Sequence, residues 1–111
     1  MAKTLNELAN ELKEYLLNSQ ADAHNKASLR PERYNNLKLS MDLGGNARPH
    51  VIVSLTFSSA EYDLKTGDRL NGGLGPDEKY VLRWFGKPGV LQDLMDCWRQ
   101  AERNRGRTTD K

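Results

Sequence analysis

Hydrophobic and polar residues alternate most regularly in the segment from Pro49 to Phe57 (PHVIVSLTF), the longest run of β-branched and aromatic residues in the chain. Every second residue is apolar, and these residues are Val51, Val53, Leu55 and Phe57. Successive side chains of a strand point to opposite faces of its sheet, so the pattern predicts a strand that buries these four. Apolar segments lie on both sides of it in the sequence, and we therefore expect it to be a central strand.

The N-terminal segment has a helical period instead. Its apolar residues recur three and four positions apart, at Leu5, Leu8, Ala9, Leu12, Tyr15 and Leu16. Thr4 and Glu7 fit a capping box, in which each side chain bonds to the backbone N–H of the other residue. The pattern predicts an amphipathic helix from about Leu5 to Ser19.

Residues 20–36 show no clear period. Pro31 disfavours a helix that runs through Arg30, so we interpret this segment as a connector. His24 lies within it, and we expect a solvated surface histidine.

Three further segments complete a sheet. Residues from Leu37 to Leu43 alternate strictly, and Gly44 to Asn46 then form a turn into the central strand. After a turn at Ser58 and Ser59, a third strand has its apolar face at Ala60, Tyr62 and Leu64. The segment 69–71 is a candidate for a short fourth strand. Three or four antiparallel strands in meander order are expected.

Two helices are predicted after the sheet. Pro76 opens the first, with acidic residues in its first turn, and Gly86 ends it. The second begins after Gly89, and its apolar residues are Val90, Leu91, Leu94, Met95, Trp98 and Ala101. We therefore predict an α+β fold with an N-terminal helix, a three- to four-stranded antiparallel meander, and two C-terminal helices packed on one face of the sheet. Residues 1–103 form a single domain, and residues 104–111 form a disordered basic tail without an apolar anchor.

Composition is typical of a soluble globular domain, with 37% hydrophobic and 29% charged residues among 111. The sequence has no apolar run of membrane-spanning length and no hydrophobic N-terminal signal region. A single cysteine, Cys97, excludes an internal disulfide and suits a reducing compartment. We therefore expect a cytoplasmic protein without membrane association, in which Cys97 is a small buried hydrophobe.

Charge is concentrated at the C-terminus. The net charge of the chain is +2, whereas residues 99–111 hold five basic residues against two acidic ones. Cations near the C-terminus of a helix are favourable, so a solvated helix end is the simpler interpretation. The alternative is an arm that contacts phosphate groups through Arg99, Arg103, Arg105 and Arg107.

His50 is the main candidate for chemistry. If Ser58 and Ser59 form a two-residue turn, Ser54 lies opposite Asp63. One sheet face then carries His50, Ser54, Glu61 and Asp63. A histidine near carboxylates can act as a base or a metal ligand, so His50, Asp63 and Glu61 are candidate catalytic residues.

The simpler interpretation of His50 is structural, because register alone does not make catalytic groups converge. The same register places Gly67 opposite His50, and we expect its ring to hydrogen-bond near the sheet edge, for example to a neighbouring turn such as the one from Thr66 to Asp68. We favour this interpretation over catalysis.

Metal and cofactor motifs are not found in the sequence. Two scattered histidines and one cysteine lack a metal-ligand spacing. Gly72, Gly73 and Gly75 precede a helix but lack the P-loop lysine and the dinucleotide-binding spacing. We expect no bound metal and no cofactor.

Aromatic residues of the two C-terminal helices recur at helical spacing, which is more typical of a core than of a base-stacking surface. Tyr80 and Trp84 are candidates for a partner-binding patch, because tyrosine and tryptophan are over-represented at interface hot spots.

The segment from Pro49 to Trp98 resembles a small prokaryotic family of unknown function. The resemblance rests on Pro49-His50-Val51, on the turn from Asp63 to Asp68, on Gly73-Leu74, and on Leu94 and Trp98 in the last helix. Members of that family have a Pro-Pro-His-Phe-His-Val strand, a D-x-x-T-G-E turn, a Gly-x-Leu-Pro step and a final Leu-x-x-x-Trp helix. The second histidine of the family is Ile52 here.

The resemblance implies one half of a two-gene cassette of the toxin–antitoxin kind, and hence a small protein partner. Our leading hypothesis is therefore a protein–protein interaction module. The alternatives are nucleic-acid binding through the C-terminal arginines, and a small hydrolase or nuclease that uses His50.

Overall fold

The computed structural model describes residues 3–22, 31–44 and 47–109. The elements follow in the order α1 (Leu5–Asp22), η2 (Pro31–Tyr34), β1 (Lys38–Ser40), β2 (His50–Ser54), β3 (Ser59–Asp63), β4 (Arg69–Gly73), η3 (Gly75–Asp77), α2 (Glu78–Phe85) and α3 (Val90–Thr109), where η marks a 3₁₀ helix. The predicted α+β class and order of helices and strands are confirmed, with four strands. His24 lies outside the described residues.

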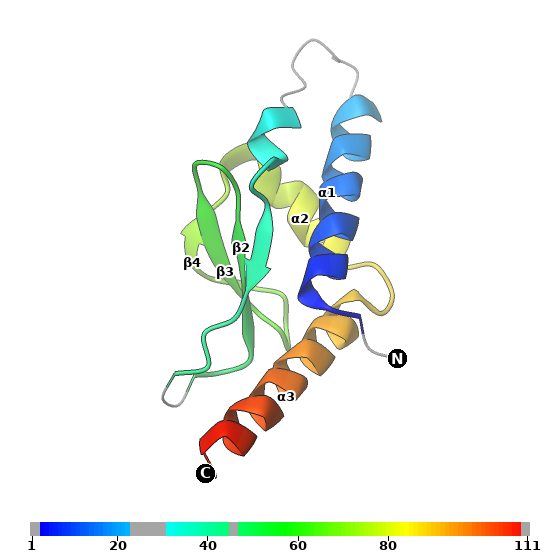
Figure 1. The fold of residues 1–111 in the computed structure, drawn as a ribbon. Helices are drawn as coiled ribbons and strands as arrows, with labels where there is room; N and C mark the ends of the chain where they lie inside the picture. The colour runs from blue at the N-terminus through cyan, green and yellow to red at the C-terminus, as the bar shows by residue number, and fades with distance from the viewer. Residues whose placement is uncertain (1–2, 23–30, 45–46, 110–111) are drawn as a thin grey trace.

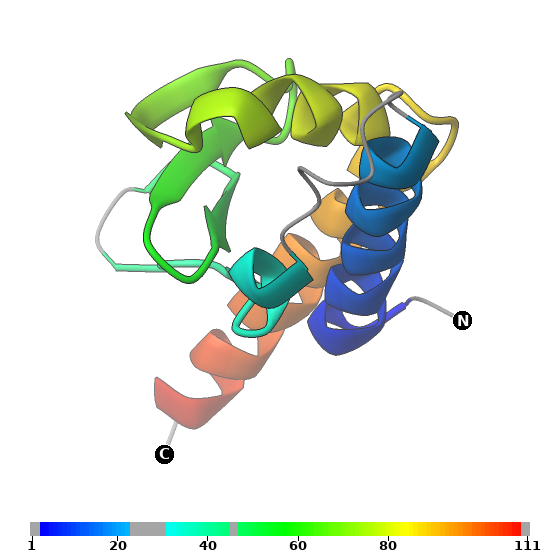
Figure 2. The ribbon, with the colours of Figure 1, turned by 90° about the horizontal axis from the view of Figure 1, so that it is seen from above.

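The four strands form one antiparallel sheet in the order β1-β2-β3-β4. Leu39 pairs with Val53, and Val51 pairs with Tyr62, so the apolar residues of neighbouring strands share a face. The three α-helices lie on one side of this sheet (Figures 1 and 2). Ser54, Glu61 and Ile52 are on its other side and are partly exposed, which is the usual division for an antiparallel sheet with one solvated face.

The core lies between the sheet and the helices. Leu39, Val53 and Leu55 are 6%, 0% and 8% exposed, so their predicted burial is confirmed. The helices contribute Leu8, Leu12, Leu16, Val81, Trp84, Phe85, Leu94 and Trp98. These residues occupy the predicted apolar faces, because the helical period places them on one side of each helix.

Phe57 differs from its prediction. Strand β2 ends at Ser54, and the N–H of Leu55 donates a 2.7 Å hydrogen bond to the carbonyl of Ser58. Residues 55–58 therefore form the turn, and Phe57 at its tip is 93% exposed. The alternation of apolar residues in the sequence continues past the end of the strand. Side chains in a turn do not alternate between two faces, so the pattern does not predict burial there.

The register in which β2 pairs with β3 also differs from the predicted one. Ser54 pairs with Ser59 and His50 pairs with Asp63, rather than Ser54 with Asp63 and His50 with Gly67. The longer turn shifts the pairing by an even number of residues. Each side chain therefore keeps its predicted face while its cross-strand partner changes.

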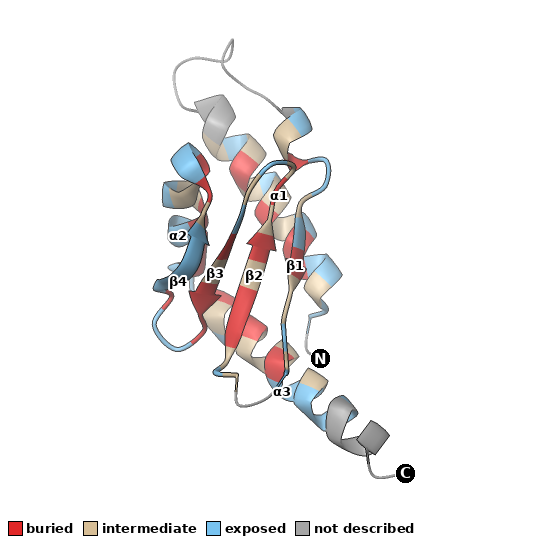
Figure 3. Cartoon of the chain, turned by 90° about the vertical axis from the view of Figure 1, so that its left-hand side faces the viewer, coloured by how far each residue is buried: buried red, intermediate tan, exposed pale blue. Residues whose placement is uncertain are grey.

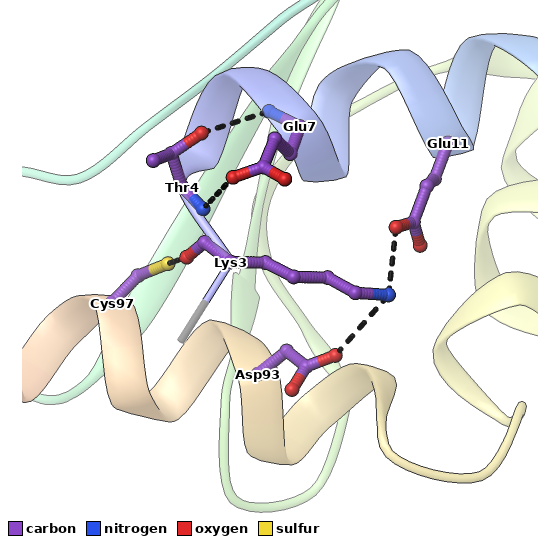
Figure 4. A network of polar contacts seen from close by, with 6 residues as sticks. All are labelled: Lys3, Thr4, Glu7, Glu11, Asp93 and Cys97. Carbon is purple, nitrogen blue, oxygen red and sulfur yellow. Dashed lines mark hydrogen bonds and ion pairs between the residues drawn. The ribbon is translucent and has the colours of Figure 1, made fainter. Parts of the chain in front are cut away.

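The start of α1 is fixed by the predicted capping box and by contacts with α3 (Figure 4). The Glu7 N–H donates to Thr4 Oγ1 at 3.1 Å, and the Thr4 N–H donates to Glu7 Oε1 at 3.0 Å. Lys3 Nζ lies 2.7 Å from Glu11 and 3.8 Å from Asp93 of α3. Lys3, immediately before α1, therefore joins Glu11 of α1 to α3 by ion pairing.

Cys97 on α3 is half-buried, and its thiol donates a 3.1 Å hydrogen bond to the Lys3 carbonyl. Burial raises the pKa of the Cys97 thiol, with smaller contributions from nearby acidic side chains such as Asp93. The thiol therefore stays protonated at neutral pH and serves as a donor rather than a nucleophile.

Helix α3 projects beyond the rest of the domain at its C-terminal end (Figure 1). Its backbone is helical as far as Thr109, so the helix includes residues 104–109 of the segment 104–111 that the sequence predicts to be disordered. Gln100, Glu102 and Arg103 are good helix formers that extend the helix past Trp98, whereas Asn104, Gly106 and the two following threonines are poor ones. Residues 110–111 lie outside the described residues, and disorder of the segment 104–111 in solution stays a prediction.

Candidate functional site

His50 is 4% exposed and its two ring nitrogens both face backbone groups. Nδ1 lies 2.7 Å from the Arg48 carbonyl, and the Asp42 N–H points at Nε2 at 3.3 Å. These partners assign the proton to Nδ1, which donates, and leave Nε2 as the acceptor. The ring also packs on Trp98 of α3, with centroids 5.1 Å apart.

This arrangement leaves neither ring nitrogen of His50 free for proton transfer or metal binding. The histidine joins the two ends of the β1–β2 connection to each other and to α3. Its hydrogen-bond partners are Asp42 and Arg48, not the turn from Thr66 to Asp68, because the register places Asp63 and not Gly67 opposite it.

The two candidate carboxylates, Asp63 and Glu61, do not form a site with His50. Asp63 is 4% exposed, and its Oδ2 accepts hydrogen bonds from the N–H and the hydroxyl of Thr66, both at 3.0 Å. Its Oδ1 lies 3.5 Å from Nε of Arg48. Glu61 is half-buried in the middle of β3, opposite Ile52 and Asn71. Asp63 therefore organises the turn into β4, and the three candidates do not form a catalytic set.

Metal ligands are not grouped in the described part of the chain, where no three histidine, cysteine or carboxylate side chains lie close enough to hold an ion. The helices in the same ranges include none that is long and apolar enough to cross a membrane.

The two aromatic candidates for partner binding differ in exposure. Trp84 is 2% exposed and packs beside Phe85 in the core, so it does not contribute to the surface. Tyr80 is half-buried, with the cationic groups of Lys79 and Arg83 at 5.2 and 5.5 Å from its ring centroid. Of these two aromatic candidates, only Tyr80 therefore contributes to the surface of α2.

A more exposed aromatic residue lies at the tip of the β2–β3 turn. Phe57 stands beside a cleft of about 250 Å³ whose apolar walls come from Leu55, Leu74 and Pro76. We call Phe57 and these three residues the Phe57 cleft. Sequence reasoning missed it because Phe57 continues the apolar alternation of β2. The available signal was the pair Ser58-Ser59, which marks a nearby turn.

The turn that carries Phe57 is attached to η2. Thr56 donates from its N–H to the Arg33 carbonyl at 3.2 Å. Its hydroxyl lies 3.0 Å from the same carbonyl and 3.1 Å from the Glu32 carbonyl. Phe57 therefore projects from a turn in which the preceding residue, Thr56, is hydrogen-bonded to η2.

The other wall of the cleft is attached to η2 as well. Asp77, at the start of α2, is completely buried, and its carboxylate accepts hydrogen bonds from Arg33 and from the Tyr34 hydroxyl. These contacts join η2 to the segment of Leu74 and Pro76. The Phe57 cleft is therefore bordered by three segments that hydrogen bonds join into one unit.

The predicted phosphate-contacting arm lies on α3. Arg99 and Arg103 are exposed and four residues apart, so they share a face of the helix. Arg99 forms an ion pair of 3.6 Å with Asp96. The side chains of Arg105 and Arg107 lie outside the described residues.

Comparisons of the chain with protein-family models, with curated proteins and with solved structures gave no match. The resemblance of residues 49–98 to a prokaryotic family therefore stays a hypothesis.

Proposed function

We propose that this protein is a protein–protein interaction module that binds its partner through the Phe57 cleft. The observation that supports this most directly is the 93% exposure of Phe57, a residue that is usually buried. Complete burial of a phenylalanine side chain is worth about 1.5–3 kcal/mol, which the free protein leaves unused and a partner can recover.

The hydrogen bonds that attach the turn to η2 should also favour partner binding. Ordering a flexible loop reduces affinity, and the bonds of Thr56 to η2 reduce that cost in advance. Interface hot spots are typically aromatic residues set beside a well-packed apolar pocket. Leu55, Leu74 and Pro76 provide such surroundings, and the family resemblance implies a small protein as the partner.

Affinity capture from native cell extract tests the proposal, with the intact chain as bait and parallel Phe57→Ala and Leu82→Ala variants. Leu82 is 41% exposed on α2 and lies outside the cleft, so it controls for loss of an exposed apolar side chain. We expect Phe57→Ala to lose a partner that Leu82→Ala retains, and purified partner to reproduce the difference. A partner retained equally by both variants would show that the cleft is not the interface.

Nucleic-acid binding through α3 is the second candidate, favoured by exposed Arg99 and Arg103 on the projecting end of that helix. Each phosphate contact contributes about 0.9 to the slope of log affinity against log salt on duplex DNA. Replacing both arginines by alanine is expected to weaken binding and to lower this slope, whereas Lys65→Ala with Lys79→Ala is not. Nuclease treatment of the extract separates the candidates, because a protein partner survives it.

A further inference from the structure

A second concave surface lies between α1 and the edge strand β1, away from the Phe57 cleft. It encloses about 720 Å³. It is lined by Asn6, Ala9 and Asn10 from α1, by Asn36, Leu37 and Lys38 at the start of β1, and by Ser54 at the end of β2. We call these seven residues the amide groove. In Figure 3, α1 passes behind β1 and extends past the free edge of the sheet, so the groove has a helix as one wall and a strand as the other.

Three carboxamide side chains line the amide groove. Asn6, Asn10 and Asn36 are exposed, and none of them forms a side-chain hydrogen bond within the described ranges. A carboxamide offers two N–H donors and a carbonyl acceptor, the same groups that a peptide backbone presents. Lys38 is the one charged residue of the lining. The groove is therefore suited to a ligand with neutral amide groups.

The strand wall of the groove is also unpaired. Among the described strands, β1 pairs only with β2, so its other edge presents backbone N–H and C=O groups without a strand partner. Asn6 and Asn10 are four residues apart, or about 6 Å along the axis of α1. A strand repeats about every 6.8 Å for each two residues, so the two amides can meet successive backbone groups on one side of an added strand.

We propose that an extended segment of a partner protein binds in the amide groove as an additional strand beside β1. Its backbone bonds to the edge of β1 and to Asn36 on one side, and to the Asn6 and Asn10 side chains of α1 on the other. Lys38 favours an acidic residue in the segment. This inference rests on the proposed role as an interaction module, but it does not depend on the Phe57 cleft.

Random linear peptides displayed on phage, selected against the immobilised full chain, provide the probe. A selected peptide is then synthesised and its Kd measured with purified protein. The test variant combines Asn10→Ala and Asn36→Ala, one from each wall. The control combines Asn18→Ala and Asn35→Ala, two exposed asparagines of the same segments that do not line the groove.

We expect the test variant to bind about tenfold more weakly, since two hydrogen bonds are lost, and the control to keep its affinity. Bound peptide is expected to slow amide hydrogen exchange between Leu37 and Ser40. Alanine is a better helix former than asparagine, so loss of α1 does not explain the expected result.

Three outcomes would overturn the proposal. One is that no peptide is selected. Another is that selected peptides bind the test variant as tightly as wild type; if they depend on Phe57 instead, the proposed function stands and the amide groove does not. The third is a concentration-dependent dimer that the test variant disrupts, because the occupant is then a second copy of this chain.

Discussion

The hydroxyl of Tyr34 donates a 2.8 Å hydrogen bond to Oδ1 of Asp77, 43 residues further along the chain. The other carboxylate oxygen accepts from Arg33, so one buried side chain joins η2 to the start of α2. Through Thr56, η2 also bonds the turn that carries Phe57. The rigidity of the Phe57 cleft therefore depends on Asp77.

Asp77→Ala should be strongly destabilising. Breaking a buried ion pair typically costs 3–5 kcal/mol, and because the Arg33 side chain is 33% exposed we expect the lower end, about 3 kcal/mol. Urea denaturation measures this loss. Tyr34→Phe removes the hydrogen bond from the hydroxyl to Asp77 and should cost about 1 kcal/mol. A loss for Asp77→Ala no larger than that would contradict the role of the carboxylate.

Truncation of Leu55 and of Phe57, two positions apart in the β2–β3 turn, should affect stability to very different extents. Leu55 is 8% exposed, so Leu55→Ala should cost about 2–5 kcal/mol through lost burial and a cavity. Phe57→Ala should change the free energy of unfolding by less than about 0.5 kcal/mol, because the side chain lies in solvent. Thermal or chemical unfolding of the two variants checks this, and similar losses would mean that Phe57 is packed in solution.

His50→Asn should lower stability by about 1 kcal/mol, since it alters the bonds of the ring to Asp42 and Arg48. Partner binding should remain unchanged. Nitrogen NMR of the wild-type ring should find the proton on Nδ1. If the variant instead keeps its stability but loses a measurable hydrolytic activity, His50 belongs to an active site.

The capping box should make part of the stability depend on pH. Hydrogen bonding from the Thr4 backbone, then from its side chain, holds the pKa of Glu7 below its usual value of 4.5. A carboxylate with a lowered folded-state pKa contributes stability above its unfolded pKa and loses that contribution as pH falls through the folded pKa. Wild type should therefore exceed Glu7→Gln in stability at neutral pH, and the difference should shrink below pH 4.5.

Urea denaturation at several pH values measures that difference. Glu14→Gln, an exposed residue further along α1, controls for the change in net charge. An equal pH dependence of the two variants would show that the cap contributes nothing through Glu7.

Much of the fold followed from local pattern alone. The helical period of Leu8, Leu12 and Leu16 and the alternation around Val53 identified α1 and the buried face of β2. Thr4 and Glu7 identified the first turn of α1. Such features depend on residues a few positions apart, because the repeats of helix and strand are set by backbone geometry.

The candidate sites depended on tertiary structure. The sequence singled out His50 and Asp63 correctly as a group on one sheet face. Only the folded chain showed that both side chains form hydrogen bonds with backbone groups, His50 with the Arg48 carbonyl and Asp63 with the Thr66 N–H.

The exposure of Phe57, the burial of Asp77 and the meeting of Asn10 with Asn36 in one groove were not visible in the sequence. Each depends on which distant segments pack together, and hence on turn length and side-chain contacts across the core. Hydrophobic pattern determines which face of an element is buried, but it does not determine which polar groups the remaining surface brings together.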